Sequence, residues 1–248
     1  FSEGGEYFDR ERAVSRGKAI EQEGADILDI GGESTRPGSE AVDEMEEERR
    51  VLPVIEALAG VIQIPISIDT YRARSARGAI DAGAQIVNDI SGFRFDDEMP
   101  RLAKQSGAGV VLMHSRGDRQ SLHRQNPMDD PVSEVRRGLA ASVEKAVAAG
   151  IPGAAVVVDP GIGFGKTAAE SLKVLKSLSE FSKLGYPLLA GTSRKSFIRL
   201  IVQDATEARS WGTAATVVAA ILNGAHIVRV HDVRQARVLA DVTDQLTC

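Results

Sequence analysis

Cysteine is almost absent from this sequence: the only one is Cys248, the last residue. A fold held together by disulfides is therefore excluded, and a reducing cytoplasm is the expected location. No apolar run approaches the ~20 residues that a membrane-spanning helix requires. The sequence also has no block of basic residues, and its formal net charge is −5. We therefore expect neither a nucleic-acid binder nor a membrane binder, because such proteins carry a positive surface.

An initiator methionine and a signal-peptide pattern are also missing, since the chain begins Phe1-Ser2-Glu3-Gly4-Gly5. Hydrophobic residues make up 43% and charged residues 26% of the 248 residues, which is ordinary for a globular chain. Neither a linker nor a shift in composition divides the sequence. One domain over residues 1–248 is therefore predicted.

Short apolar runs recur along the chain, five of them opening with Gly-Ala and each ending near a polar residue. Such runs without alternation are typical of parallel strands that are buried on both faces. Seven are visible, at residues 24–29, 64–69, 83–88, 107–114, 153–159, 187–191 and 224–229.

Segments with helical periodicity lie between several of these runs. They are at residues 42–58, 135–146, 172–181 and 234–246, and residues 211–222 form a further, almost wholly apolar segment that we expect to be a buried helix. Alternating strands and helices predict an α/β fold with a parallel sheet. A (β/α)₈ TIM barrel is preferred over a doubly wound sheet, with the first strand expected to precede residue 1.

Every predicted strand ends in side chains that carry charge or form hydrogen bonds, and a barrel brings the carboxyl ends of its strands together at one face. A polar strand end is more often a cap or a loop start when taken singly, but seven together indicate a site for a small polar ligand with an anionic part.

Three other kinds of site are disfavoured. Gly161–Thr167 resembles a phosphate-binding loop, but Pro160 replaces its first glycine; the histidines lack metal-site spacing; and Ser193 lacks a nucleophile elbow.

Seven motifs occur in an order that resembles the dihydropteroate synthases, the folate-pathway enzymes that sulfonamides inhibit. The motifs are Glu33–Gly38, Ser67–Thr70, Asn88–Gly92, Met113-His114, Asp159–Phe164, Ser193–Phe197 and Arg229–Asp232. The resemblance implies a TIM barrel and a homodimer. It also implies a Mg²⁺-using transferase that joins 6-hydroxymethyl-7,8-dihydropterin diphosphate to 4-aminobenzoate and releases pyrophosphate.

The resemblance also implies a role for each matching residue. The pterin is expected at Asp69, Asn88, Met113, Asp159, Phe164, Gly191 and Lys195, and the diphosphate at Thr35, Arg229 and His231. The aminobenzoate is expected at Arg36, Pro37, Phe164, Lys195 and Ser196. Lys195, Arg36, Thr35 and Glu3 are the expected catalytic residues. Arg229 taken by itself is as well explained by a structural salt bridge, and His231 by an ordinary loop histidine.

The family is thought to react through an SN1-like step, in which no enzyme nucleophile is needed. The sequence shows no Ser/His or Cys/His arrangement, in keeping with such a step. The asparagine that usually binds Mg²⁺ in the family has no match here, so the metal ligand is unknown, and Glu3 stands where many members have Asp. Two alternatives stay open: a methyltetrahydrofolate-dependent methyltransferase, and a non-catalytic paralogue that binds a pterin. Substitutions at Phe1, Pro37 or Ser196 are expected to alter sulfonamide affinity.

Overall fold

The computed structural model describes residues 9–36, 38–122 and 125–247. The chain forms two compact units, the first from Phe1–Val111 with Lys145–Ala155 and the second from Leu112–Glu144 with Val156–Cys248. The single domain over residues 1–248 stays a prediction. Within the described ranges, no helix is long and apolar enough to cross a membrane.

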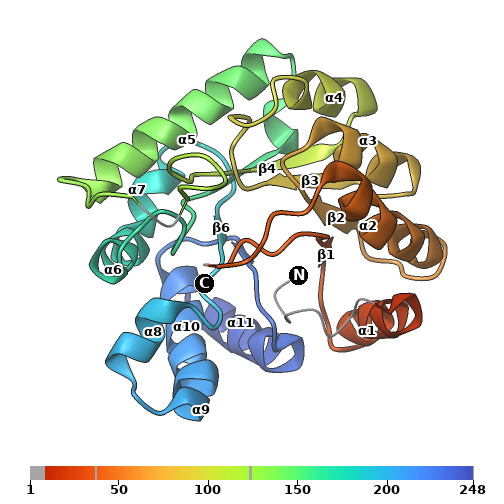
Figure 1. Cartoon of the computed structure of the whole chain (residues 1–248). Helices are drawn as coiled ribbons and strands as arrows, with labels where there is room; N and C mark the ends of the chain where they lie inside the picture. The colour runs from red at the N-terminus through yellow and green to blue at the C-terminus, as the bar shows by residue number, and fades with distance from the viewer. Residues whose placement is uncertain (1–8, 37, 123–124, 248) are drawn as a thin grey trace. The chain divides into compact units, whose positions relative to one another are not determined.

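Strands and helices alternate in the first unit, and strands that follow one another along the chain pair in parallel (Figure 1). Asp69 at the end of one strand lies directly opposite Asn88 on the next. The strands are β1 (Leu28–Ile30), β2 (Ile66–Asp69), β3 (Ile86–Asp89) and the start of β4 (Gly109–Met113), and the helices are α1 (Arg10–Gln22), α2 (Glu44–Ala59), α3 (Ala73–Asp81) and α4 (Met99–Ser106).

The second unit continues the same alternation. The end of β4 lies beside β5 (Val156–Asp159), where the His114 N–H donates to the Asp159 carbonyl, and a parallel bridge joins Val158 to Leu188. Next come β6 (Leu189–Ala190) and β7 (Ile227–Val228), which pair in parallel. The helices are α5 (Pro131–Ala148, which from Lys145 on belongs to the first unit), α6 (Ala168–Lys176), α7 (Leu178–Ser182), α8 (Ser196–Ile201), α9 (Ala205–Glu207), α10 (Thr213–Leu222) and α11 (Val233–Thr247). Two short helical turns are η1 (Gly153–Ala155, in the first unit) and η2 (Ala208–Gly212).

Local sequence explains why these helices begin where they do and which face they bury. The Asp43 side chain caps α2 by accepting the Glu46 N–H at 2.8 Å, and the apolar face of the helix buries Val51 and Leu58 completely or nearly so. A capping box between Thr167 and Glu170 begins α6. The parallel α/β fold and the seven predicted strands are confirmed within the described residues.

One predicted helix differs from the structure. Residues 211–222 were expected to form a buried helix, but α10 begins at Thr213 and Trp211 lies in the preceding η2 turn. The Trp211 side chain is 71% exposed and that of Leu222 53% exposed. The expectation of burial is therefore wrong: α10 has α11 beside it (Figure 1), yet part of its apolar surface faces outward. An apolar sequence does not specify how much of a helix its neighbours cover.

Arg72 joins two buried carboxylates in the first unit. Its guanidinium donates to Glu33 at 2.8 Å and to Glu47 at 2.9 Å, and these side chains are only 3% and 1% exposed. Glu47 also accepts hydrogen bonds from Thr70 and Ser75. Because Glu33 lies in the loop after β1 and Glu47 lies on α2, the network fixes this loop to the helix.

We expect Arg72→Leu to destabilise the protein by about 3–5 kcal/mol, because it leaves buried carboxylates without their cation. Arg74→Leu is the matched control, since Arg74 is 62% exposed and pairs with Glu48 at the surface. Its loss is expected to cost at most about 1 kcal/mol. Urea unfolding of both variants measures the difference, and equal losses would contradict the role given to Arg72.

Candidate active site

The ends of β1, β2 and β3 bring polar side chains together in the first unit. Asp69 and Asn88 are 6% and 7% exposed and occupy paired positions on β2 and β3. The Asn88 amide donates to the Asp29 carboxylate on β1 at 3.1 Å. Two carboxylates and an amide therefore line these neighbouring strand ends, where they offer acceptors and one donor to a polar ligand.

The loop after β1 carries further predicted residues. Thr35 is buried and Arg36 exposed. The Ser39 hydroxyl donates to the Arg36 carbonyl at 2.8 Å, so the loop is folded on itself. Pro37 and Glu3, like Phe1, lie outside the described residues, so the predictions for them are untested.

Asp159 is the centre of the second unit's polar cluster. It ends β5, is 6% exposed, and its carboxylate accepts the Gly161 N–H at 2.7 Å. Burial raises the pKa of Asp159, while the Gly161 hydrogen bond and the cations Lys195, Lys166 and Arg229 act against that rise. Three cations thus lie close enough to Asp159 to influence its ionisation.

Lys195 and Phe164 meet in the same unit. The Lys195 ammonium lies 4.2 Å from the centre of the Phe164 ring, a cation–π contact. Gly163 has φ of 83°, a left-handed conformation that favours glycine, and a Cβ there would lie 3.3 Å from the Lys195 side chain. Lys195 is the residue before α8, and Ser196 is the exposed first residue of that helix. An aromatic face with a cation over it suits a flat polar ligand.

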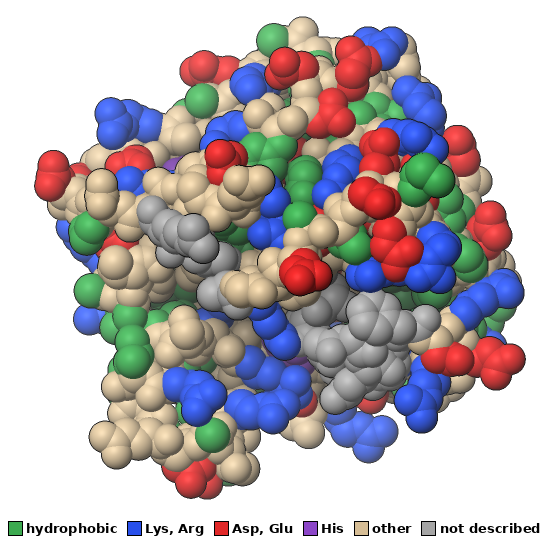
Figure 2. Space-filling view, viewed as in Figure 1, with side chains coloured by type: hydrophobic (Ala, Val, Ile, Leu, Met, Phe, Trp, Pro, Cys, Tyr) green, Lys and Arg blue, Asp and Glu red, His purple; other side chains and the backbone are tan. Residues whose placement is uncertain are grey.

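The ends of β6 and β7 hold the residues predicted to bind the diphosphate. Arg229 donates its N–H to the Ala190 carbonyl, and a Cβ at Gly191 would lie 3.9 Å from the Arg229 Cβ. Lys and Arg side chains gather on the face that carries α8 and α10 (Figure 2). This surface is suited to an anionic group.

His231 is held by Ser193, whose hydroxyl lies 2.8 Å from the imidazole Nδ1. The two residues are 38 positions apart, so no Ser/His arrangement is visible in the sequence and the pair forms only in the folded chain. Ser193 is 5% exposed and Arg194 beside it pairs with Asp232 at 2.7 Å. We interpret the Ser193 contact as one that orients His231, because a hydrogen bond at Nδ1 fixes the direction in which the second ring nitrogen, Nε2, points.

The structure thus collects the predicted residues into two sets, one in each unit. The first contains Asp69, Asn88 and the loop with Thr35 and Arg36; the second contains Met113, Asp159, Phe164, Gly191, Lys195, Ser196, Arg229 and His231. Their roles stay predictions. Lys166, whose ammonium donates to three backbone carbonyls, was not among the predicted site residues. The glycine-rich stretch before it was the available signal, but it was considered only as a phosphate-binding loop.

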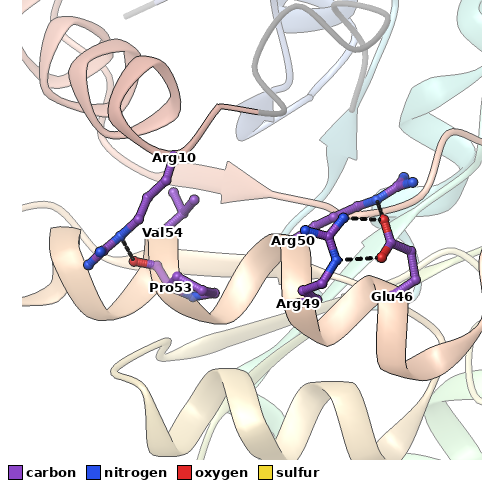
Figure 3. A pocket seen from close by; sticks show the side chains of 6 residues that line it. All are labelled: Arg10, Glu46, Arg49, Arg50, Pro53 and Val54. Atoms are coloured by element: carbon purple, nitrogen blue, oxygen red, sulfur yellow. Dashed lines mark hydrogen bonds and ion pairs between the residues drawn. The ribbon is translucent and has the colours of Figure 1, made fainter.

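Other features of the described residues fit no predicted site. A cavity of about 360 Å³ is lined by Arg10 of α1 and by Glu46, Arg49, Arg50, Pro53 and Val54 of α2 (Figure 3). Glu46 already accepts hydrogen bonds from both Arg49 and Arg50, and the pKa of its carboxyl is lowered to about 2 by them. Among the residues that the structure describes, no group of three or more His, Cys, Asp or Glu side chains could hold a metal ion.

Parallel strands whose carboxyl ends carry acids, an amide and cations are the arrangement in which α/β enzymes place their ligand-binding residues. The model of the pterin-binding enzyme family matches residues 1–231. A dihydropteroate synthase of Synechocystis sp. is 46% identical over 247 residues, which cover 99% of this chain and 86% of that protein.

Three solved structures are similar along nearly the whole chain. A dihydropteroate synthase from Clostridium difficile, determined in the presence of pteroic acid, is 41% identical with a TM-score of 0.91, over 99% of this chain and 91% of that one. The Yersinia pestis enzyme in a sulfonamide complex is 35% identical with a TM-score of 0.93, over 98% and 88%. The Xanthomonas albilineans enzyme with 4-aminobenzoic acid is 40% identical with a TM-score of 0.91, over 100% and 89%.

The chain belongs to the pterin-binding enzyme family. Its enzyme class is that of the dihydropteroate synthases, which are transferases, and the predicted α/β fold of the TIM-barrel family is confirmed. The resemblance that the seven motifs indicated is therefore correct.

Proposed function

We propose that this protein condenses 6-hydroxymethyl-7,8-dihydropterin diphosphate with 4-aminobenzoate and releases pyrophosphate. The observation that carries the proposal is the cluster in the second unit, where three cations act on the buried Asp159 carboxylate and one of them, Lys195, lies over the Phe164 ring. The related structures determined in the presence of pteroic acid and with 4-aminobenzoic acid support this reaction.

The pterin edge is the part of the substrate that Asp159 suits best. This edge presents neighbouring N–H donors, and an ionised carboxylate accepts two such bonds side by side. Lys195 supplies donors for the ring's oxygen and nitrogen acceptors, while Phe164, Met113 and Gly191 provide apolar surface and space. A buried carboxylate left without donors is costly, so the site discriminates against analogues that lack the matching edge.

The diphosphate is assigned to the ends of β6 and β7. Arg229 and His231 follow β7 there, and Ser193 orients the imidazole. A guanidinium gives paired N–H donors to phosphate oxygens and stabilises negative charge as pyrophosphate leaves. This stabilisation is greatest in the transition state, which is where it accelerates the reaction.

The first unit's residues are assigned by the resemblance. Asp69 and Asn88 are proposed to bind other ring nitrogens of the pterin, and their neighbouring strand-end positions and burial support a polar-contact role. Thr35 and Arg36 are proposed as loop residues that act on the substrates. Ser196, together with Pro37, is proposed to bind the aminobenzoate, with the Ser196 hydroxyl donating to its carboxylate.

The proposed chemistry is displacement of pyrophosphate from the pterin CH₂ group by the aromatic amine. An SN1-like path places positive charge on the CH₂ carbon, which the electron-rich ring stabilises. The protein then contributes orientation and stabilisation of the leaving group rather than a nucleophile. The amine loses one proton as its N–C bond forms, so charge and atoms balance.

Mg²⁺ use is a separate part of the proposal. When bound, Mg²⁺ supplies positive charge to the diphosphate, and it commonly keeps several waters and takes few protein ligands. The described residues contain no cluster suited to a protein-built metal site. We therefore assign no metal ligand and route no step of the reaction through the ion.

A homodimer and a cytoplasmic location complete the proposal. Large apolar side chains are exposed on α8, η2 and α11, among them Leu200 at 74%, Trp211 at 71% and Leu246 at 73%. A second copy of the chain is the proposed cover for this surface. The cytoplasmic location is supported by the near-absence of cysteine.

Pyrophosphate release tests the proposed reaction. We expect release from the pterin diphosphate only when 4-aminobenzoate and Mg²⁺ are both present, with competitive inhibition by a sulfonamide against the aminobenzoate. EDTA is expected to stop the reaction, and added Mg²⁺ to restore it. Tight pterin binding without release would instead favour the non-catalytic paralogue or the methyltransferase, and the absence of any pterin binding would overturn the proposed site.

A further inference from the structure

Lys166 has an unusual set of partners in the second unit. Its ammonium donates to the backbone carbonyl of Gly161 at 2.8 Å and to those of His114 and Phe164 at 3.1 Å each. An ammonium has three donors, and all three are used by backbone oxygens. Lys166 therefore has no spare donor for a phosphate, unlike the lysine of a phosphate-binding loop.

The chain around Lys166 is wound so that these oxygens converge on one point. Gly161, Gly163 and Gly165 all have positive φ angles, of 63°, 83° and 63°. The Phe164 N–H donates to the Gly161 carbonyl, which closes a turn between two of the residues whose carbonyls bind Lys166. Carbonyl oxygens that converge repel one another, so a cation at their centre stabilises a backbone shape that is otherwise unfavourable.

Two of the three carbonyls belong to residues that also hold substrate-binding groups. The Gly161 N–H donates to the Asp159 carboxylate at 2.7 Å, and the Phe164 ring lies 4.2 Å from the Lys195 ammonium. The third carbonyl belongs to His114, whose N–H is bonded to the Asp159 carbonyl. Of the residues whose carbonyls bind Lys166, Gly161 and His114 are therefore hydrogen-bonded to Asp159, and Phe164 carries the aromatic ring of the cluster.

The surroundings of Lys166 act on its charge in both directions. Burial lowers the pKa of Lys166 to about 7, while Asp159 and Glu170 raise it and Lys195 and Arg116 lower it further. Only the protonated amine can donate to all three carbonyls at once. Lys166 in turn acts to lower the pKa of Asp159, together with Lys195 and Arg229.

We propose that Lys166 is a positioning residue for the reaction: its ammonium holds the Gly161–Lys166 turn so that the Asp159 carboxylate and the Phe164 ring are placed before substrate arrives. The inference rests on the proposed function, because it assumes that Asp159 and Phe164 bind the pterin. Lys166 is not a catalytic residue, since its donors are already occupied by backbone.

The test compares Lys166→Met with Lys166→Arg. Methionine keeps most of the length of the side chain and removes the charge, whereas arginine keeps the charge but cannot direct donors to three converging oxygens. Lys173→Met is the matched control, because Lys173 lies nearby on α6 but is 54% exposed with only a 3.8 Å contact to Asp130. The readouts are kcat and KM from pyrophosphate release, the Kd of pteroic acid by calorimetry, and amide hydrogen exchange at residues 161–166.

We expect both Lys166 variants to lose about 10²-fold in kcat/KM, the usual effect of displacing binding groups by about 1 Å. The Kd of pteroic acid should rise as well, and amide exchange should speed up at residues 161–166 only. In Lys166→Met the pH below which pteroic acid affinity is lost should move upward. Lys173→Met should match wild type. A general loss of stability would instead raise exchange throughout the chain.

Other results of the same experiments would contradict the positioning role of Lys166. Wild-type kcat/KM and Kd in Lys166→Met would overturn the proposal, as would full activity in Lys166→Arg, because charge alone would then suffice. If Lys166→Met does not fold, the Arg variant decides by the same readouts. If wild type binds pteroic acid but releases no pyrophosphate, the proposed function fails, and the Kd and exchange measurements still test the positioning role.

Discussion

Asp159→Asn is expected to reduce kcat/KM by about 10²- to 10⁴-fold. The variant loses two hydrogen bonds from the pterin to a charged acceptor, which are worth about 1.5–3 kcal/mol each. Asparagine keeps the shape and one oxygen, which can still accept the Gly161 N–H. The fold should therefore survive. The NH₂ group that replaces the second oxygen faces the pterin's own donors and repels them.

The pH dependence of pterin binding gives the same prediction a second measurement. Only the ionised Asp159 accepts both donors, so affinity in wild type should fall as the pH is lowered through the pKa of this group. Burial raises that pKa above the usual value for Asp, so the loss should begin at a higher pH than for an exposed carboxyl. Calorimetric titration with pteroic acid across pH measures this.

Two variants serve as controls for the Asp159 prediction. In Asp159→Asn this pH dependence should disappear, because asparagine does not titrate. Asp241→Asn changes an exposed carboxylate on α11 that pairs with Arg237 at the surface, and it should leave affinity and activity unchanged. Retained activity in Asp159→Asn would remove the central residue from the proposed site.

Gly161→Ala is expected to have the second large effect, and it arises from backbone geometry rather than charge. Gly161 has φ of 63°, and a Cβ there would overlap the His114 carbonyl oxygen. The left-handed conformation costs a residue with a Cβ roughly 1–2 kcal/mol. The overlap cannot be relieved without moving the turn, and a shift of about 1 Å at the site costs about 10²-fold in rate.

Gly185→Ala separates these two contributions. Gly185 has φ of 80°, but nothing lies within 4 Å of its added Cβ. It should therefore lose only the conformational part, about 1–2 kcal/mol of stability, with unchanged kcat/KM. Thermal unfolding and pyrophosphate release on both variants measure stability and rate. Equal effects in the two variants would contradict the close approach of Gly161 to His114.

Much of the fold could be predicted from hydrophobic patterning. Strands such as Ile66–Asp69 are continuous apolar runs because both of their faces are buried, and this makes them visible in sequence. The helix Ala73–Asp81 was missed, since the residues it buries are Ser75, Ala76 and Ala79, which are too small to produce an apolar stripe. Shape complementarity, rather than hydrophobicity, places that helix.

The candidate site was predictable as a set of residues but not as an arrangement. Asp159, Lys195 and Arg229 were each identified from motifs, yet nothing local in the sequence indicates that two cations flank one buried carboxylate. Lys166 shows the limit most clearly: its three acceptors include His114, which is 52 residues away along the chain. A lysine's role depends on which oxygens surround it, and those are set by tertiary structure.

The amino-acid sequence alone determined the alternation of strands and helices, the polar residues at the strand ends and the family resemblance, because these depend on local pattern and motif order. Only the tertiary structure decided that Arg72 joins Glu33 to Glu47, that Ser193 holds His231, and that Lys166 binds three carbonyls. Such contacts join residues far apart in the chain, and their strength depends on distance, burial and direction, which a linear sequence does not specify.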